Sequence, residues 1–233
     1  LPAQVSENSL LASNGVNPAT FLRNLRCSPR LLGGGCYTIC NMVSMPPTPK
    51  AKIITVTGPS GVGKTTIVCE LFAAKPELAF VVSLTSRAPR DSDLPGEYRC
   101  SVAEDEFARR SANGEFLWTV DAHGNTYGTL VASVDEALER EQPSLMILVP
   151  DRVEFIRRRA PDQVLSFFIV PPQETILRER LARRGESPEV IERRIADCKA
   201  WTDDARSSHI PYTFIGNDGS VGDAVRQLLA HLS

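Results

Sequence analysis

A glycine-rich segment between two apolar runs constrains the fold more than any other feature of the chain. Residues 58–66 read GPSGVGKTT; they follow the β-branched run 52–57 (KIITVT) and precede the run 67–74 (IVCELFAA), which predicts a helix. Glycines let successive backbone N–H groups point at a phosphate chain, and the N-terminus of the following helix adds positive charge. The segment therefore predicts a site for a nucleoside triphosphate, built as strand, loop and helix.

The spacing inside this segment predicts a role for its polar residues. Gly58, Gly63, Lys64 and Thr65 complete the pattern G-x-x-x-x-G-K-[ST]. In this pattern Lys64 is expected to reach the β- and γ-phosphates, and the hydroxyl of Thr65 to bind Mg²⁺. The residues expected to hold the triphosphate are Gly58, Pro59, Ser60, Gly61, Val62, Gly63, Lys64, Thr65 and Thr66.

From residue 52 onward, short β-branched runs alternate with longer amphipathic ones. Strands are predicted over 52–57, 80–84, 145–149 and 164–170, with a last one at 212–215. Helices are predicted over 65–74, 132–140, 151–159, 173–183, 188–207 and 220–232. Alternation of this kind predicts parallel strands joined by helical crossovers, that is, a three-layer α/β/α sandwich. Between 85 and 129 the pieces are shorter, more polar and marked by Gly and Pro, so an inserted substrate lobe is expected there.

Composition limits the classes of function. A formal net charge of -2 argues against a dedicated nucleic-acid binder, and no apolar run approaches the roughly 20 residues that cross a bilayer. The six cysteines lack paired C-x-x-C spacing. A zinc site or a disulfide framework is therefore not expected, and the reducing cytoplasm is the expected location.

The first 45 residues differ from the rest of the chain. They contain one acidic residue, three arginines and a triple glycine, without a sustained helical or strand period. This composition predicts a disordered tail before a single domain at 46–233. Two origins for the tail stay open: an artefact of the gene model, with translation starting at Met42 or Met45, or an organellar transit peptide.

A second phosphate site is predicted directly after the strand at 80–84. Residues 83–90 read SLTSRAPR, in which Arg87 and Arg90 flank a proline and present two guanidinium groups from one turn. Such forks match the oxygens of a phosphomonoester. Tyr98 and Tyr127 lie in the same inserted region, in the segments PGEYR and GNTYGT.

Together these segments resemble the guanylate kinase family over nearly all of 52–233. The family patterns S-x-T-[ST]-R-x-P-R, G-x-x-Y and G-N-x-Y-G-[ST] stand here as SLTSRAPR, GEY (one residue shorter) and GNTYGT. The resemblance implies ATP and Mg²⁺ as cofactors, and phosphoryl transfer to a nucleoside monophosphate, first of all GMP. It also implies an acceptor site made of Ser83, Arg87, Arg90, Tyr98, Tyr127 and Thr129.

The C-terminal third resembles the family in two further segments. RLARRGES at 180–187 is similar to the start of the family's lid, which implies that Arg184 and Arg194 are catalytic arginines of a lid at about 183–195. GNDGS resembles the segment that lies against the adenine of ATP, which implies a contact from Asn217. The implied division is a core of 50–84 and 130–233 around an acceptor-binding lobe at 85–129. An acceptor phosphate is already ionised at neutral pH, so no catalytic base is expected.

One departure from the family concerns recognition of the acceptor base. The family reads guanine with a carboxylate in a G-x-F-[IL]-E segment, but the corresponding GEFLW of this chain has Trp118 at that position. Three interpretations stay open: Asp121 or Glu115 substitutes for the carboxylate, Trp118 stacks on a different base, or Trp118 packs the lobe.

A second departure lies at the end of the strand at 145–149. The family ends this strand in D-x-D, whereas this chain reads LVPD, so Asp151 comes one position late. Asp151 is then either a water-mediated partner of Mg²⁺ or the N-cap of the next helix.

These departures leave a related function open as an alternative. Ribose 1,5-bisphosphate phosphokinases lack the base-reading carboxylates, and their sequences are similar to AHGNTYG and NDGS of this chain, although they generally lack the full arginine–tyrosine clamp. Interaction modules of the same fold typically lose the glycines and lysine of the phosphate loop, which this chain keeps. A GTPase is not expected, because N-K-x-D is absent. The expected partners are nucleotide substrates, without nucleic acid or membrane, and the chain is expected to be a monomer or homodimer.

Overall fold

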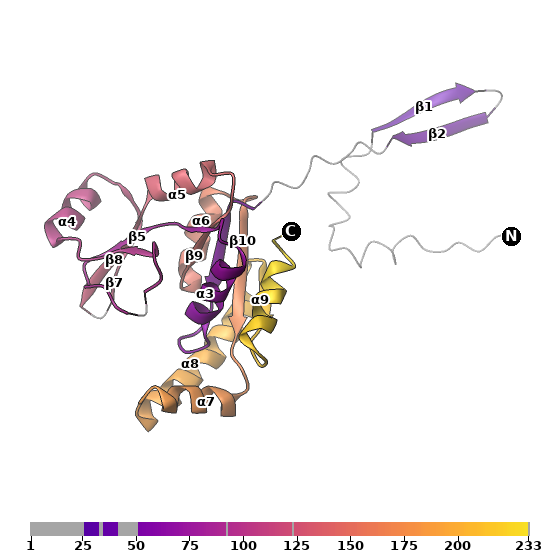
Figure 1. Cartoon of the computed structure of the whole chain (residues 1–233). Coiled ribbons are helices and arrows are strands. Elements are labelled where there is room, and N and C mark those ends of the chain that lie inside the picture. Colours follow the sequence, from indigo (N-terminus) through magenta and orange to yellow (C-terminus); the bar gives the residue numbers. More distant parts are fainter. Residues whose placement is uncertain (1–25, 33–34, 42–50, 92, 123, 233) are drawn as a thin grey trace. The chain divides into compact units, whose positions relative to one another are not determined.

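The computed structural model describes residues 26–32, 35–41 and 51–232, except positions 92 and 123, and the chain divides into the units 1–48 and 49–233 (Figure 1). In the first unit, strand β1 (Arg26–Leu32) pairs antiparallel with β2 (Gly35–Asn41). The sequence predicts no strand here. Hairpin pairing uses main-chain groups that every residue carries, so it does not require an apolar period. The rest of the predicted tail lies outside the described residues.

In the second unit the described residues form seven helices and nine strands. They are β3 (Ile53–Thr57), α3 (Lys64–Ala74), β4 (Ala79–Phe80), β5 (Ser83–Thr85), β6 (Tyr98–Arg99), α4 (Glu104–Ala112), β7 (Phe116–Ala122), β8 (Asn125–Leu130), α5 (Val131–Glu139), β9 (Ser144–Ile147), α6 (Pro150–Arg159), β10 (Val164–Val170), α7 (Glu174–Arg183), α8 (Pro188–Ser207), β11 (Tyr212–Gly216) and α9 (Val221–Leu229). Among the described residues, no helix is both long enough and apolar enough to span a membrane.

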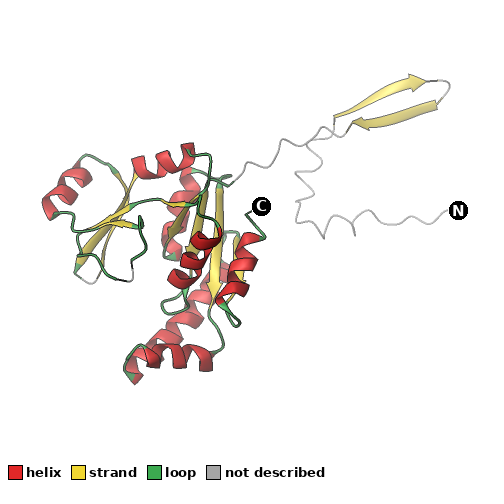
Figure 2. Cartoon of the chain, in the orientation of Figure 1, coloured by secondary structure: helices red, strands yellow, loops and turns green. Residues whose placement is uncertain are grey.

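Five of the strands form a parallel sheet in the order β11-β10-β3-β9-β4. All five residues of the central strand β3 are buried, which explains why it reads as a continuous apolar run. Ile54 packs in a core with Leu71 of α3 and Leu228 of α9, while Ile53 packs in a second core with Ile156 of α6. Figure 2 shows helices on both sides of this sheet. The predicted three-layer α/β/α sandwich is confirmed.

The inserted lobe has a sheet of its own, in the order β6-β5-β8-β7. One face of this sheet packs against α4, where the rings of Phe107 and Phe116 stack with their centroids 5.4 Å apart. Gly128 is required on this face because a Cβ there would lie 2.6 Å from the Phe116 ring. The helix α4 was not predicted, since its polar sequence EDEFARRSA buries Phe107 alone.

The prediction of one strand over 80–84 is wrong. The chain leaves the core sheet after Phe80 and enters the lobe sheet at Ser83. Between them, the N–H of Val81 donates to the carbonyl of Leu145 at 3.0 Å, and Val82 is exposed. An apolar run shows that residues are suited to strands, but not that they belong to two different sheets.

The carboxyl ends of β3, β9, β10 and β11 meet at one edge of the parallel sheet, the edge at which open α/β sheets bind ligands. The loop 58–63 follows β3, and Asn217 follows β11. In Figure 1, α7 and α8 lie below this edge and the lobe lies to the left of the sheet.

Candidate active site

The loop between β3 and α3 has a backbone that requires glycine. Gly58, Gly61 and Gly63 have φ values of 142°, 88° and 97°. A Cβ on Gly58 would lie 2.7 Å from the carbonyl oxygen of Ile169, and one on Gly61 would lie 2.9 Å from Leu181. Side chains are excluded by both conformation and space, so the loop leaves its backbone open to a ligand, as a phosphate cradle requires.

Lys64 begins α3 and folds back over this loop. Its ammonium donates to the carbonyl oxygens of Gly58 at 2.7 Å and Pro59 at 2.8 Å. Burial is the main cause that lowers the pKa of Lys64 to about 8; the charge of Arg184 acts in the same direction, and Cys198 acts against it. Both of these hydrogen bonds from the half-buried ammonium go to neutral carbonyls, so an anionic phosphate would be a stronger partner.

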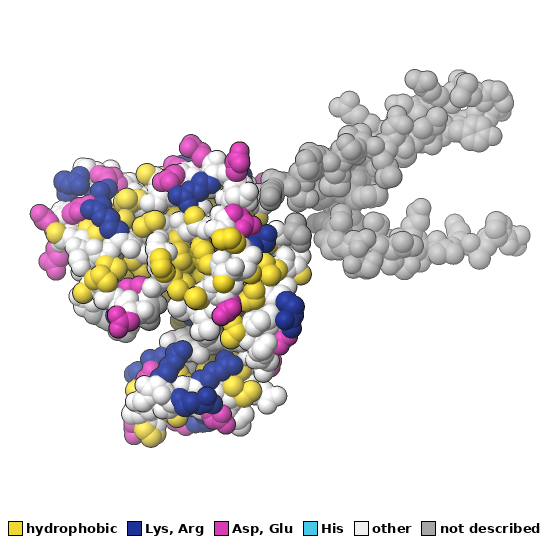
Figure 3. Space-filling view, in the orientation of Figure 1, with side chains coloured by type: hydrophobic (Ala, Val, Ile, Leu, Met, Phe, Trp, Pro, Cys, Tyr) yellow, Lys and Arg dark blue, Asp and Glu magenta, His cyan; other side chains and the backbone are white. Residues whose placement is uncertain are grey.

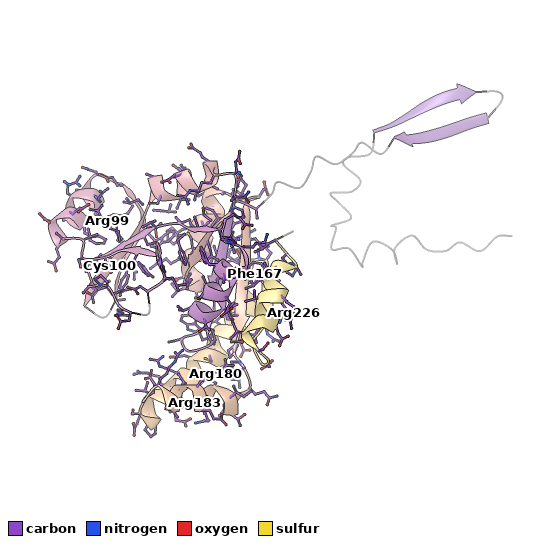
Figure 4. The ribbon with its side chains drawn as sticks, viewed as in Figure 1. Arg99, Cys100, Phe167, Arg180, Arg183 and Arg226 are labelled. Carbon is purple, nitrogen blue, oxygen red and sulfur yellow. The ribbon has the colours of Figure 1, made fainter. Side chains whose placement is uncertain are left out.

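A cavity of about 340 Å³ adjoins the loop. Its lining residues are Gly61, Gly63, Thr66, Arg180, Arg183, Arg184, Asn217 and Val221. Figure 4 labels Arg180 and Arg183 on α7, and Figure 3 shows dark-blue basic side chains gathered over α7 and α8. Arg180 and Arg183 were not predicted as site residues, although the run R-x-x-R-R at 180–184 carried the signal. Three arginines around one cavity suit a polyanion.

Arg194 reaches the same loop from α8. Its Nη1 donates to Oγ of Ser60 at 2.7 Å, and its Nη2 pairs with Glu186 at 2.9 Å. The structure thus brings both arginines of the predicted lid to the phosphate loop, Arg194 by direct contact and Arg184 by lining the cavity. Their role in transfer stays a prediction.

Asn217 braces the loop from the end of β11. Its side chain is buried, and its Nδ2 donates to the carbonyl oxygen of Val62 at 2.5 Å. A Cβ on Gly63 would lie 3.0 Å from this nitrogen. The Oδ1 atom of Asn217 has no hydrogen-bond partner among the described residues. The residue therefore lies at the loop, where the sequence predicts a nucleotide contact.

The residues present fit Mg²⁺ only as an ion shared with a substrate. Among the described residues, no group of three or more His, Cys, Asp or Glu could hold a metal ion. Mg²⁺ usually keeps several waters and is held by one or two protein groups together with substrate phosphates. The exposed hydroxyl of Thr65, in the first turn of α3 beside the loop, suits this mode.

Of the two interpretations left open for Asp151, the one that makes it the N-cap of α6 is wrong. The helix begins at Pro150 with Val149 as its N-cap, and there is no side-chain cap bond. Asp151 lies in the first turn, where its exposed carboxylate pairs with Arg152 at 3.6 Å. Proline at the first helical position already fixes where the helix starts, and an acid in the first turn favours the helix dipole.

In the lobe, the face opposite α4 gathers polar and aromatic side chains. Ser83 pairs with Tyr98 in the register, and Thr85 pairs with Tyr127, so these four side chains share one face. The Oγ of Ser83 lies 2.7 Å from Oγ1 of Thr129. The rings of Tyr98 and Tyr127 meet edge to face with centroids 6.1 Å apart.

The guanidinium of Arg87 lies over both tyrosine rings. Its guanidinium carbon is 5.1 Å from the centroid of Tyr98 and 5.9 Å from that of Tyr127. Asp93 accepts two hydrogen bonds from this guanidinium, both at 2.7 Å, and these bonds are the main cause that raises the pKa of Arg87. Arg90, on the same turn, has an exposed side chain. The predicted acceptor residues thus come together, and Asp93 is an additional residue that the sequence analysis missed.

Trp118 packs inside the unit. It is 9% exposed, lies in a cluster with Val81, Met146 and Ile156, and its ring centroid is 5.9 Å from that of Phe155. Of the three open interpretations, the packing role is the one that these contacts support.

The two carboxylates considered as substitutes already have partners within the lobe. Glu115 pairs with Arg110 at 2.7 Å, and Asp121 accepts a hydrogen bond from Thr126 at 2.7 Å. Neither carboxylate is left without a partner in this structure.

Trp118→Glu is expected to lower the free energy of unfolding by about 4 kcal/mol, because it removes a buried indole and leaves a carboxylate in an apolar cluster. The melting temperature followed by circular dichroism should fall by about 10 °C. Trp118→Phe keeps an apolar ring, so its melting temperature should fall much less. A Trp118→Glu variant that melts with the wild type would contradict the packing role.

The comparisons with known proteins match most of this chain. The family model described as guanylate kinase matches residues 50–233. The guanylate kinase of Symbiobacterium thermophilum is 39% identical over 189 residues, 80% of this chain and 86% of that protein. The guanylate kinase of Streptomyces coelicolor is 34% identical over 186 residues, 80% of this chain and 92% of that protein.

A solved structure supports the fold. The crystal structure of guanylate kinase from Anaplasma phagocytophilum aligns with a TM-score of 0.57 at 22% identity, over 79% of this chain and 85% of that chain. The phosphate loop, the inserted lobe with its arginine and tyrosines, and the match over 50–233 lead to one conclusion. The chain belongs to the guanylate kinase family.

Proposed function

We propose that the chain transfers the γ-phosphoryl group of ATP to a nucleoside monophosphate, with GMP as the acceptor. The observation that carries this proposal is the presence of two separate anion sites in one unit: the loop around Lys64 and the lobe clamp around Arg87. Transfer between two polyanions depends on positioning both of them and on neutralising their charge. The relatives named guanylate kinase support the choice of acceptor.

On the donor side, the loop backbone from Gly58 to Thr66, with Asn217 bracing it, would hold the ATP phosphates. Lys64, Arg184 and Arg194 would neutralise the charge that develops on the transferring group. Mg²⁺, held by Thr65 and the phosphates, would add further positive charge there when bound. The loop groups are fixed by the fold before the reaction, so they cost little reorganisation, whereas Arg184 and Arg194 would take up their working positions when the lid closes.

On the acceptor side, side chains from three strands and one turn would hold the monophosphate in line with the donor. These are Ser83, Arg87, Arg90, Tyr98, Tyr127 and Thr129. The attacking phosphate oxygen is already ionised, so the chain needs no general base. The proposal also divides the unit into a core, an acceptor lobe and a lid (183–195) that close on the substrates and exclude water. We place the lobe at 83–130 rather than at the expected 85–129, because β5 begins at Ser83 and β8 ends at Leu130.

The free thiols of Cys69, Cys100 and Cys198 support a reducing compartment such as the cytoplasm. We propose this location together with a nucleotide-only set of partners, and a monomer or homodimer as the working state.

ADP release from Mg·ATP tests the function. The purified chain should turn over with GMP in a panel that also contains dGMP, AMP, UMP, CMP and ribose 1,5-bisphosphate, and excess EDTA should abolish that turnover. Turnover with ribose 1,5-bisphosphate alone would assign the chain to the related phosphokinases. No turnover with any acceptor, while ATP still binds, would contradict a kinase function.

A further inference from the structure

The guanidinium of Arg87 is only partly satisfied by its partners. Nη1 donates to the carbonyl oxygen of Ala88 at 2.9 Å and to Oδ2 of Asp93 at 2.7 Å, and Nη2 donates to Oδ1 of Asp93 at 2.7 Å. Arg87 is only 7% exposed, yet its buried Nε has no hydrogen-bond partner among the described residues. A buried donor without a partner is costly, so this Nε is available to a ligand that supplies an acceptor.

The free donors lie on one edge of the guanidinium plane. Of the five N–H groups, Asp93 takes two at the Nη1–Nη2 end and Ala88 takes one. The side chain of Tyr127 is also a hydrogen-bonding neighbour of this guanidinium. Asp93 and Ala88 leave Nε–H and the second N–H of Nη2, which point the same way along the side of the plane. That edge is a second fork, and it matches two oxygens of a phosphate as well as the first matches a carboxylate.

Asp93 is itself held in place, so it can fix the direction of this edge. Its Oδ2 accepts a hydrogen bond from the backbone N–H of Arg90 at 2.9 Å, and its own N–H donates to the carbonyl of Arg90 at 3.0 Å. The hydrogen bond from Arg87 is the main cause that lowers the pKa of Asp93, which keeps the carboxylate ionised. The guanidinium of Arg87 also lies against the rings of Tyr98 and Tyr127, which limit its movement on that side.

We propose that Asp93 is a positioning residue for the acceptor: it grips the Nη1–Nη2 end of Arg87 and thereby presents the Nε–Nη2 edge to the phosphomonoester. This inference rests on the proposed function, because it concerns the acceptor side of the same site. Asp93 is a permanent support in this arrangement. It does not occupy the edge that the phosphate needs, so it does not have to leave when the acceptor binds.

The sign of one substitution separates this role from its rivals. Asp93→Asn removes a negative charge from an anion site, so Coulomb attraction alone predicts tighter binding of the acceptor. If the carboxylate of Asp93 instead competed with the phosphate for Arg87, its removal would also tighten acceptor binding. Positioning predicts weaker binding, because the amide NH₂ of asparagine would face an N–H of the guanidinium and only one of the two bonds to Arg87 could remain.

We expect Asp93→Asn to raise the KM and the Kd for GMP about tenfold, with kcat and the KM for ATP nearly unchanged. Asp93→Glu keeps a carboxylate, so it should raise the KM and Kd for GMP less than Asp93→Asn does. The matched control is Asp91→Asn, which removes the same charge from an exposed residue of the same turn and should leave both KM values as they are. In an Arg87→Ala background, Asp93→Asn should add no further rise.

Tighter or unchanged GMP binding in Asp93→Asn would overturn the inference. So would an equal loss of ATP and GMP affinity, or a full additional loss in the Arg87→Ala background, because each would indicate a general structural effect. If Arg87→Ala itself left the affinity for GMP unchanged, the proposed acceptor site would be wrong rather than the role of Asp93 alone.

Discussion

Lys64→Ala should lower the turnover number with Mg·ATP and GMP by about a thousandfold. The ammonium of Lys64 is the group that closes over the phosphate loop, 2.7 Å and 2.8 Å from two of its carbonyl oxygens. Removing one preorganised donor that stabilises developing negative charge costs about 10²- to 10³-fold in kcat. Lys64 also carries a full positive charge, so the upper end of this range is expected.

The measurement is kcat at saturating ATP and GMP, with the melting temperature recorded on the same samples. Burial lowers the pKa of Lys64 to about 8, which means that the folded protein holds this charge at a cost, so the variant should be no less stable at neutral pH. Lys75→Ala, at the other end of the same helix, is the matched control and should keep wild-type kcat. A kcat within tenfold of wild type in Lys64→Ala would contradict the donor site.

Arg87→Ala should weaken the binding of GMP about a hundredfold while the affinity for ATP stays the same. Two hydrogen bonds from a guanidinium to a phosphate contribute about 3 kcal/mol, which corresponds to that factor. Arg87→Lys keeps the charge but removes the planar fork, so it should recover only part of the loss. The buried position of Arg87 against Tyr98 and Tyr127 makes it the central acceptor residue in our account.

Titration calorimetry with GMP and, separately, with ATP measures this effect. Arg99, labelled on the lobe in Figure 4, is an exposed arginine on β6, and Arg99→Ala is the control that should leave GMP binding unchanged. Unchanged GMP affinity in Arg87→Ala would place the acceptor phosphate elsewhere. Equal loss of ATP and GMP affinity would indicate instead that the variant disturbs the whole unit.

The core of the fold could be predicted from the sequence because its signals are local. Parallel strands buried on both faces read as apolar runs, and the glycine spacing at 58–63 fixes a loop between a strand and a helix. The strand at 164–170 and the helix at 188–207 have the predicted bounds. The split of 80–84 between two sheets could not be predicted, because the choice of sheet depends on Leu145, far away in sequence.

In the candidate site, too, the features with local sequence signals could be predicted and those that depend on three-dimensional contacts could not. Lys64, named by a short pattern, lies at the glycine loop, and Arg87, also named by one, lies against Tyr98; their roles stay predictions. The role of Asp93 could not be predicted from the sequence, because it depends on the two hydrogen bonds that Asp93 accepts from the guanidinium of Arg87. Trp118 was left with three interpretations until the structure showed its contact with Phe155. The interpretation of Asp151 as a helix cap was wrong, because the helix already begins at the preceding proline.

The central claim is that phosphate passes between two sites of this one unit. Incubating the purified chain with ATP labelled in its γ-phosphate, Mg²⁺ and GMP, and separating the products, tests it most directly. We predict that the label appears in GDP with wild-type protein and not with Lys64→Ala. Label that appears only as inorganic phosphate, or that stays in ATP while both nucleotides bind, would contradict the account.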